Sequence, residues 1–287
     1  TYRQKARKAY LSLSKKRRKS GRDIRKGIKA QLGWLGRNIR TIDHLLDGHA
    51  GLFPLSYKDQ RKVWIIKEVY RQQEQMYRMK SKRIDGRIVS ISQPHVRPIV
   101  RGKAGAKVEF GAKISASVVE GNAFLDRISW DAYNESGDVR SQVENYRERF
   151  GYYPEVIIAD TIYGTRDNRR YLKKHGIRYS GTALGRPSKD RERNRKESRR
   201  RKKEAGIRNQ IEGVFGVGKR RFGLGRVMTK LRETSESWIA MVIFVMNISR
   251  WLRDIFYPYL NRLFITHFGE PVMPDPCLER QRMNQTA

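Results

Sequence analysis

The most constraining feature of this sequence is an acidic residue at the end of a short apolar segment, followed by a second acid within a helical pattern. Residues 156–159 read Val-Ile-Ile-Ala, which predicts a buried strand, and Asp160 stands at its end. Arg208, Glu212 and Lys219 follow with the spacing R-x3-E-x6-K, which places them within about 40° of one another on a helix. Two acids so placed in a very basic chain are the arrangement that a Mg²⁺-dependent nucleic-acid enzyme needs.

Each of these residues alone also has an ordinary structural explanation. A strand-end aspartate often only caps a turn, and an Arg-x3-Glu pair is commonly a surface ion pair worth ~0.3–0.5 kcal/mol. An adjoining apolar stripe, which would hold the helix against a core, consists of Ile207, Ile211, Val214, Phe215 and Phe222. The ordered combination of acids and cations in a basic chain favours the catalytic interpretation.

Net charge points to a polyanionic partner. The chain carries 63 Lys and Arg against 29 Asp and Glu, a formal charge of +34. Fifteen of these cations and a single acid lie in residues 1–40, and residues 186–203 hold eleven basic and three acidic residues. The second segment cannot bury a core, so we expect a tether that is mobile without a partner and that contacts DNA phosphates through residues including Arg199, Arg200 and Arg201.

Cysteine usage and hydropathy exclude several other classes. Cys277 is the only cysteine, so neither an intrachain disulfide nor a cysteine-based zinc cluster is expected. Nothing resembles a signal peptide, and the longest apolar run, residues 238–246, is far shorter than the ~20 residues that span a bilayer. These features predict a cytoplasmic, nucleoid-associated protein without a membrane partner.

Helical patterns dominate the first 84 residues. A coiled-coil-like seam is formed by Ile24, Ile28, Leu32, Leu35, Ile39, Ile42 and Leu46, at spacings of four and three. A second helix is expected over residues 57–80, with Val63, Ile66, Tyr70 and Tyr77 facing inward. Together they predict a helical hairpin with one basic face.

Shorter patterns from Arg87 onward predict strands that alternate with helices. Strands are expected over residues 88–91, 110–119, 124–130, 156–159 and 177–180, and helices over 139–150, 167–175 and around Glu212. An apolar helix over 238–264 is expected to pack on the core, with binding to a partner as the alternative. The expected domains are a basic helical hairpin (1–84), an α/β core with C-terminal helices (85–265) and a disordered tail (266–287).

Two stretches of the chain resemble a known family. VIIADTIYGTRDNRRYLKKHGIRYSG (156–181) and RNQIEGVFGVGKRRFGLGR (208–226) are similar to the DDE transposases of bacterial insertion sequences, and the resemblance runs from roughly Arg87 to Arg232. Many members carry Y-x2-R-x3-E-x6-K around their third acid, and this chain has Ala205 in place of the tyrosine. The resemblance implies an RNase H-like mixed sheet flanked by helices.

The resemblance also implies roles for the residues of the site. Asp160 would be the second acid of the triad and the shared ligand of two Mg²⁺ or Mn²⁺ ions, and Glu212 would be the third acid and ligate the second ion. Arg208 and Lys219, with Arg220 and Arg221 beside Lys219, would hold phosphates of double-stranded DNA at the element ends and the target. A homo-oligomer is compatible with the family, although no interface can be read from the sequence.

The first acid of the triad has no clear counterpart. In relatives with a comparable helical segment the first Asp precedes that segment, which would place it before residue 1. We therefore expect this chain to be the C-terminal portion of a transposase, with poor or no strand-transfer activity by itself. Asp85, in a polar turn, is the one acid near the start of the core that could serve as a substitute. The competing hypothesis is a non-enzymatic, basic DNA-binding remnant. An RNA-binding protein is a weaker alternative, because no RNP-like aromatic motif is present.

Overall fold

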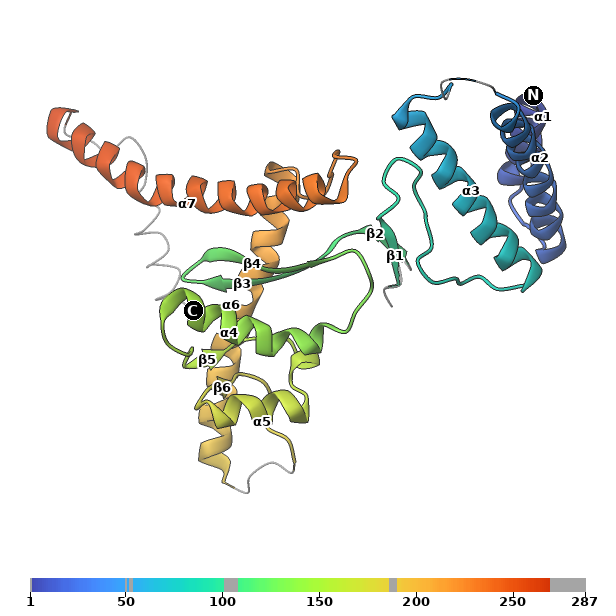
Figure 1. Cartoon of the computed structure of the whole chain (residues 1–287). Helices are drawn as coiled ribbons and strands as arrows, with labels where there is room; N and C mark the ends of the chain where they lie inside the picture. The colour runs from blue at the N-terminus through green and yellow to red at the C-terminus, as the bar shows by residue number, and fades with distance from the viewer. Residues whose placement is uncertain (1, 50, 52–53, 101–107, 186–189, 269–287) are drawn as a thin grey trace. The chain divides into compact units, whose positions relative to one another are not determined.

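The computed structural model describes residues 2–49, 51, 54–100, 108–185 and 190–268. The chain divides into two compact units, one made of Thr1–Ala112 and Trp130–Ala132 and the other of Lys113–Ser129 and Tyr133–Ala287. Helices α1 to α3 and the β1–β2 pair belong to the first unit, and the later helices with the β3–β4 and β5–β6 pairs belong to the second; Figure 1 labels them. This division groups residues by packing, and the expected domain boundaries stay predictions.

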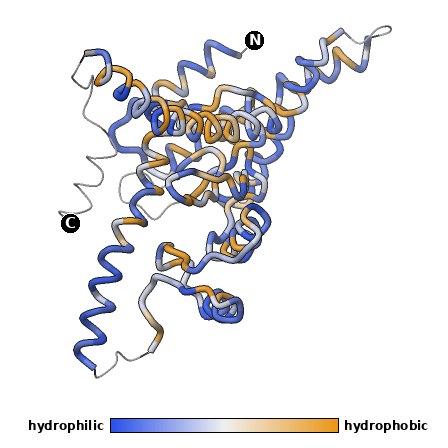
Figure 2. The backbone as a smooth tube through the Cα atoms, turned by 90° about the vertical axis from the view of Figure 1, so that its left-hand side faces the viewer, coloured by the Kyte–Doolittle hydropathy of each residue, from blue (hydrophilic) through white to orange (hydrophobic). Residues whose placement is uncertain are grey.

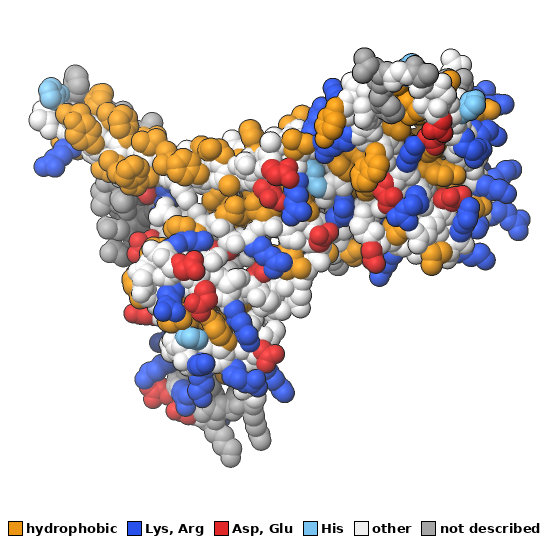
Figure 3. Space-filling model, viewed as in Figure 1, with side chains coloured by type: hydrophobic (Ala, Val, Ile, Leu, Met, Phe, Trp, Pro, Cys, Tyr) orange, Lys and Arg blue, Asp and Glu red, His pale blue; other side chains and the backbone are white. Residues whose placement is uncertain are grey.

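The described residues of the first unit form three helices where the sequence predicted a hairpin of two. They are α1 (Arg3–Lys15), α2 (Gly21–Asp47) and α3 (Tyr57–Arg78). Ser20 starts α2, because its hydroxyl accepts a hydrogen bond from the backbone N–H of Asp23, and Ser56 caps α3 in the same way. The break before Ser20 therefore separates α1 from the predicted helix. Lys and Arg side chains cover much of the visible surface of these helices (Figure 3).

The residues that the helices of the first unit bury differ from those predicted to face inward. Ile24, Ile28 and Ile42 of the expected seam are 37–42% exposed, and α3 buries Ile65, Gln72 and Met76 rather than the four residues expected. Residues 88–91 form no strand: the Gln72 side chain bonds the backbone N–H of Ile88 at 2.9 Å and the carbonyl of Gly86 at 3.2 Å. The unit's strands are β1 (Arg97–Val100) and β2 (Val108–Gly111), which pair antiparallel.

A β-hairpin opens the second unit. β3 (Lys113–Val119) and β4 (Asn122–Ser129) pair antiparallel through a tight turn in which Glu120 and Gly121 both have positive φ, 50° and 79°. The predicted strand over 110–119 is divided at Ala112, after Gly111 with a φ of 137°. The hairpin thus begins at Lys113, close to where the second unit begins.

A parallel strand pair with its crossover helix carries the site. β5 (Val156–Ile157) and β6 (Arg178–Tyr179) pair in parallel and are joined by α5 (Arg166–Lys174), while α4 (Asp138–Phe150) packs beside them. Their shared core consists of Val139, Val143, Leu172 and Ile177, each at most 4% exposed. Burying these four aliphatic side chains contributes about 1.5–3 kcal/mol each. Both strands are shorter than predicted.

Two long helices complete the second unit, and both extend beyond the predictions. α6 runs over Arg191–Arg221, so the expected tether is helical from residue 191; residues 186–189 lie outside the described part. Asp190 caps this helix by accepting from the N–H groups of Glu192 and Arg193, and Glu192 pairs with Lys196 one turn on. Figure 2 shows its hydrophilic first half as a continuous blue coil. α7 runs over Arg232–Phe268, into the range expected to be disordered; residues 269–287 are outside the described part.

The apolar surfaces of α6 and α7 are only partly covered. Ile207 of the expected α6 stripe is 42% exposed. The first half of α7 packs on β4 and buries Ile239, Val242 and Ile243. In the second half, Trp251, Leu252, Ile255 and Phe256 are more than half exposed, and apolar side chains cover this part of the helix in Figure 3. The expectation that the whole of α7 packs on the core is therefore wrong.

The arrangement of the strands differs from the single mixed sheet that was expected. The described strands form three separate two-stranded sheets, β1–β2, β3–β4 and β5–β6, and not one mixed sheet. A mixed α/β class agrees with the structure, and an RNase H-like core remains a prediction. None of the helices in the described part of the chain combines the length and apolar character that a membrane crossing requires.

Candidate active site

Asp160 lies three residues beyond the end of β5 and is exposed. Its side chain caps the short 3₁₀ helix η2 (Thr161–Tyr163): Oδ1 accepts a hydrogen bond from the backbone N–H of Thr161 at 2.7 Å. Its side chain is 66% exposed, and Oδ2 has no hydrogen-bond partner among the described residues. Asp160 therefore caps a turn, as its structural explanation requires, and still presents one oxygen to solvent.

Two residues that the sequence did not single out hold the backbone around Asp160. The Tyr179 hydroxyl, at the end of β6, donates to the carbonyl of Asp160 at 2.7 Å. Arg169 of α5 donates to the carbonyls of Gly164 at 2.9 Å and Thr182 at 2.6 Å, and its guanidinium lies 4.8 Å from the centre of the Tyr179 ring. Burial raises the pKa of Tyr179, which keeps its hydroxyl a neutral donor.

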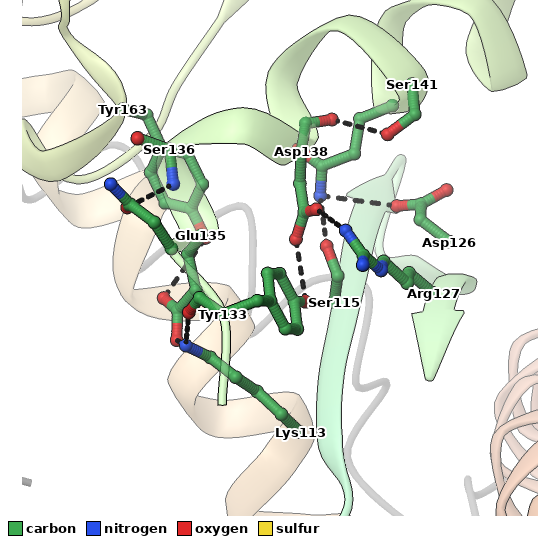
Figure 4. A network of polar contacts seen from close by, with 12 residues as sticks. Lys113, Ser115, Asp126, Arg127, Tyr133, Glu135, Ser136, Asp138, Ser141 and Tyr163 are labelled. Carbon is green, nitrogen blue, oxygen red and sulfur yellow. Dashed lines mark hydrogen bonds and ion pairs between the residues drawn. The ribbon is translucent and has the colours of Figure 1, made fainter. Parts of the chain in front are cut away.

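A polar network holds η2 from the opposite side. The Tyr163 hydroxyl lies 3.4 Å from Oε2 of Glu135, whose other oxygen pairs with Lys113 at 3.0 Å (Figure 4). Asn168 is 5% exposed and donates to the carbonyls of Tyr163 and Ser136 at 2.9 and 2.7 Å. Burial, reinforced by the nearby Glu135 carboxylate, raises the pKa of Tyr163 well above its ordinary value. The turn that begins at Asp160 is therefore anchored on both sides.

Arg208 brings α6 to Asp160. Its Nη1 lies 3.4 Å from Oδ1 of Asp160, across 48 residues of sequence. The side chains are 40% and 66% exposed, so the ion pair adds little to stability. Its importance is positional, because it joins the strand-end acid to the helix that carries the second acid.

Glu212 lies one turn after Arg208 on the same stripe of α6. Residues four apart on a helix have Cβ atoms about 5–6 Å apart, so Glu212 is on the next turn from the residue that contacts Asp160. Glu212 is exposed and forms no ion pair or hydrogen bond with another described residue. Both of its oxygens can therefore accept an external ligand.

The remaining predicted phosphate contacts lie along α6, at a distance from Asp160. Lys219, Arg220 and Arg221 form the exposed last turn, and Lys219 is about 10 Å along the helix axis from Glu212. At the other end, Arg201 lies 3.4 Å from the Thr182 hydroxyl, Arg200 is near Glu197 and Glu204, and Arg199 is exposed. The predicted cations thus line one helix, and only Arg208 contacts Asp160.

The donor set at Asp160 and Glu212 fits a hard cation in part. Carboxylate oxygens are the ligands that Mg²⁺ prefers, and this ion retains several waters. Oδ2 of Asp160 and both oxygens of Glu212 are available. In the described residues, no group of three or more His, Cys, Asp or Glu side chains is placed to hold a metal ion. Two carboxylates are thus what this site offers.

Comparison with known proteins identifies this region. Residues 157–249 match the transposase DDE domain family, a range that includes Asp160, Arg208 and Glu212. No curated protein and no solved structure matches the chain significantly. The family match confirms the resemblance drawn from the sequence for this region: residues 157–249 match a transposase DDE domain.

Proposed function

We propose that this chain acts on double-stranded DNA as an insertion-sequence transposase, through Mg²⁺- or Mn²⁺-dependent strand cleavage and transfer. The observation that supports this most is the 3.4 Å contact between Arg208 and Asp160. It places the strand-end acid beside the helix stripe that carries Glu212. Metal ions bound by such acids would activate an attacking oxygen and stabilise the leaving oxygen of an in-line displacement.

Residues of this chain have separable tasks in the proposal. Asp160 and Glu212 supply carboxylate oxygens to the metal ions. Arg208, held at Asp160, is placed to contact a scissile phosphate, and its planar guanidinium suits paired hydrogen bonds to phosphate oxygens. The cations at the two ends of α6 would hold the flanking DNA backbone.

Direct metal binding tests the site. Mn²⁺ titration followed by electron paramagnetic resonance, with and without a duplex that carries an element end, should show binding that Asp160→Asn or Glu212→Gln removes. Any metal-dependent cleavage that the unsubstituted chain shows should be lost in the same variants, while duplex binding stays nearly unchanged, because affinity comes from the basic surface. Asp167→Asn is the matched control, because Asp167 is another exposed acid of this region, paired only with Arg170 on its own helix. Mn²⁺ binding that survives both site substitutions would refute the assignment.

A non-enzymatic DNA-binding protein is the second candidate. Its supporting observation is that the described residues bring no third ligand to Asp160 and Glu212. It predicts DNA binding with a steep salt dependence and no metal-dependent cleavage by the present chain. Cleavage that requires Asp160 would exclude it.

A further inference from the structure

Glu204 is a buried acid on the stripe of α6 that carries the proposed site. It lies one turn before Arg208, which lies one turn before Glu212, so the three side chains share one face at intervals of about 6 Å along the axis. Glu204 is 6% exposed, although the helix around it is among the most polar parts of the chain. A carboxylate is rarely buried without a partner.

The partner of Glu204 comes from β6. Oε1 of Glu204 lies 2.6 Å from Nη2 of Arg178, and Nε of Arg200 lies 3.8 Å from the same oxygen. Arg178 precedes Tyr179, whose hydroxyl holds the backbone of Asp160. One side of α6 is thus tied to the β5–β6 pair at two successive turns: Glu204 to Arg178, and Arg208 to Asp160.

The Glu204–Arg178 pair is poorly optimised as a source of stability. Oε2 of Glu204 and Nη1 of Arg178 are buried and have no hydrogen-bond partner among the described residues. An ion pair whose carboxylate is buried and whose atoms are partly unsatisfied regains little of its desolvation cost. Such pairs are best attested as devices that fix the register of packed elements.

We propose that Glu204 is a positioning residue, which sets the register of α6 against the β5–β6 pair and thereby the separation between Asp160 and Glu212. The inference rests on the proposed function of those two acids. A slip of α6 by one residue turns its stripe by about 100° and moves it about 1.5 Å. The Arg208–Asp160 contact, in which both side chains are exposed, is too weak to prevent such slips alone. A register that separates Glu204 from Arg178, whose side chain is 38% exposed, leaves the buried carboxylate with only the 3.8 Å contact to Arg200.

Distance measurement tests the register directly. Spin labels at Asp167→Cys on α5 and Asn209→Cys on α6, in a Cys277→Ser background, report the position of α6 against the strand pair by pulsed electron paramagnetic resonance. The labelled parent should give one narrow distance distribution. Glu204→Gln should broaden or shift it, and Arg178→Gln/Glu204→Gln, whose amides can bond to each other, should restore it in part.

The matched control is Glu197→Gln, which removes the same charge from the same helix. Glu197 is 36% exposed and pairs with Arg200 within α6, so it ties the helix to no other element. Its distance distribution should equal that of the parent. An unchanged distribution in Glu204→Gln, at conditions where the variant is folded, would overturn the proposal.

Metal affinity provides the functional readout. Glu204→Gln should weaken Mn²⁺ binding about tenfold, as expected when an outer residue that orients metal ligands is lost, and Glu197→Gln should leave it unchanged. A loss of stability without a change in affinity or distance would assign Glu204 a purely structural role and overturn the inference. If Asp160→Asn leaves Mn²⁺ binding intact, the proposed function fails, while the distance data still decide whether Glu204 sets the register.

Discussion

Replacing Asp138 should destabilise the segment that supports the site more than replacing any exposed acid does. Asp138 begins α4 and is 1% exposed. Its Oδ1 accepts from Nη1 of Arg127 at 3.0 Å, and its Oδ2 accepts from the Tyr133 hydroxyl at 2.8 Å (Figure 4). Asp138→Ala removes the common acceptor of both groups.

The magnitude follows from these two contacts. A hydrogen bond to a charged group contributes about 1.5–3 kcal/mol. The hydrogen bond to Tyr133 should contribute about 1.5 kcal/mol, the lower end of this range. The hydrogen bond to Arg127 should contribute about 1 kcal/mol, because the arginine side chain is 49% exposed and water can replace its partner. With the lost packing of the carboxyl group, Asp138→Ala should cost about 3 kcal/mol.

Asp138→Asn should cost less, about 1–1.5 kcal/mol. The amide oxygen can still accept from Arg127, and the amide nitrogen can donate to the Tyr133 hydroxyl, which also accepts. The charge is lost, and the Tyr133 hydroxyl changes from donor to acceptor in this contact. Comparison of the two variants therefore separates the contribution of the charge from that of the hydrogen-bond geometry.

Hydrogen exchange of the α4 amides is the appropriate assay, because a chain of two units need not unfold in one step. A loss of 3 kcal/mol should speed their exchange about a hundredfold. Asp167→Ala is the matched control, because Asp167 is also a first-turn acid paired with an arginine but is 73% exposed; it should change exchange in α5 by less than about threefold. Equal effects of the two substitutions would refute the argument from burial.

Three further predictions follow from other contacts. Asn247→Leu should lower the free energy of unfolding, measured in urea, by about 2–3 kcal/mol. The reason is that the Asn247 side chain accepts from the N–H of Ala123 at 2.9 Å and donates to its carbonyl at 2.7 Å. An unchanged stability would show that α7 does not hold β4 in this way. The pKa of Tyr163 is raised in the folded protein, so its contribution to stability is complete below pH 10.0, the ordinary pKa of tyrosine, and is lost as the pH rises above that value. Tyr163→Phe should therefore reduce the fall in the urea midpoint at alkaline pH. An identical fall in both proteins would contradict this prediction. Replacing residues 199–201 by glutamine should lower the affinity for duplex DNA and make the slope of log affinity against log salt concentration shallower by about 2–3. Lys58→Gln, in the other unit, is the control. An unchanged slope would exclude DNA contact by this end of α6.

The sequence by itself determined the order of most elements in the second unit and the resemblance of residues 157–249 to a transposase DDE domain. Periodicity located α4 and the helix around Glu212, because their apolar residues repeat at helical spacing. Gly151 and Gly176 mark the ends of α4 and α5. The strand-end position of Asp160 followed from the apolar run before it. These features depend on local backbone preference and burial, which neighbouring residues largely decide.

Tertiary structure decided which charged residues matter to the arrangement. Glu204, Arg178 and Tyr179 looked like ordinary members of polar or short apolar segments, and nothing local shows that residues 26 apart form an ion pair across two elements. The basic stretch from residue 191 was predicted as a tether, because it has no apolar residues whose spacing could indicate a helix. Its helix is stabilised by the aspartate cap and by charge pairs between successive turns. Partners distant in the sequence are chosen by packing, so the contacts that place Asp160 beside α6 exist only in the folded chain.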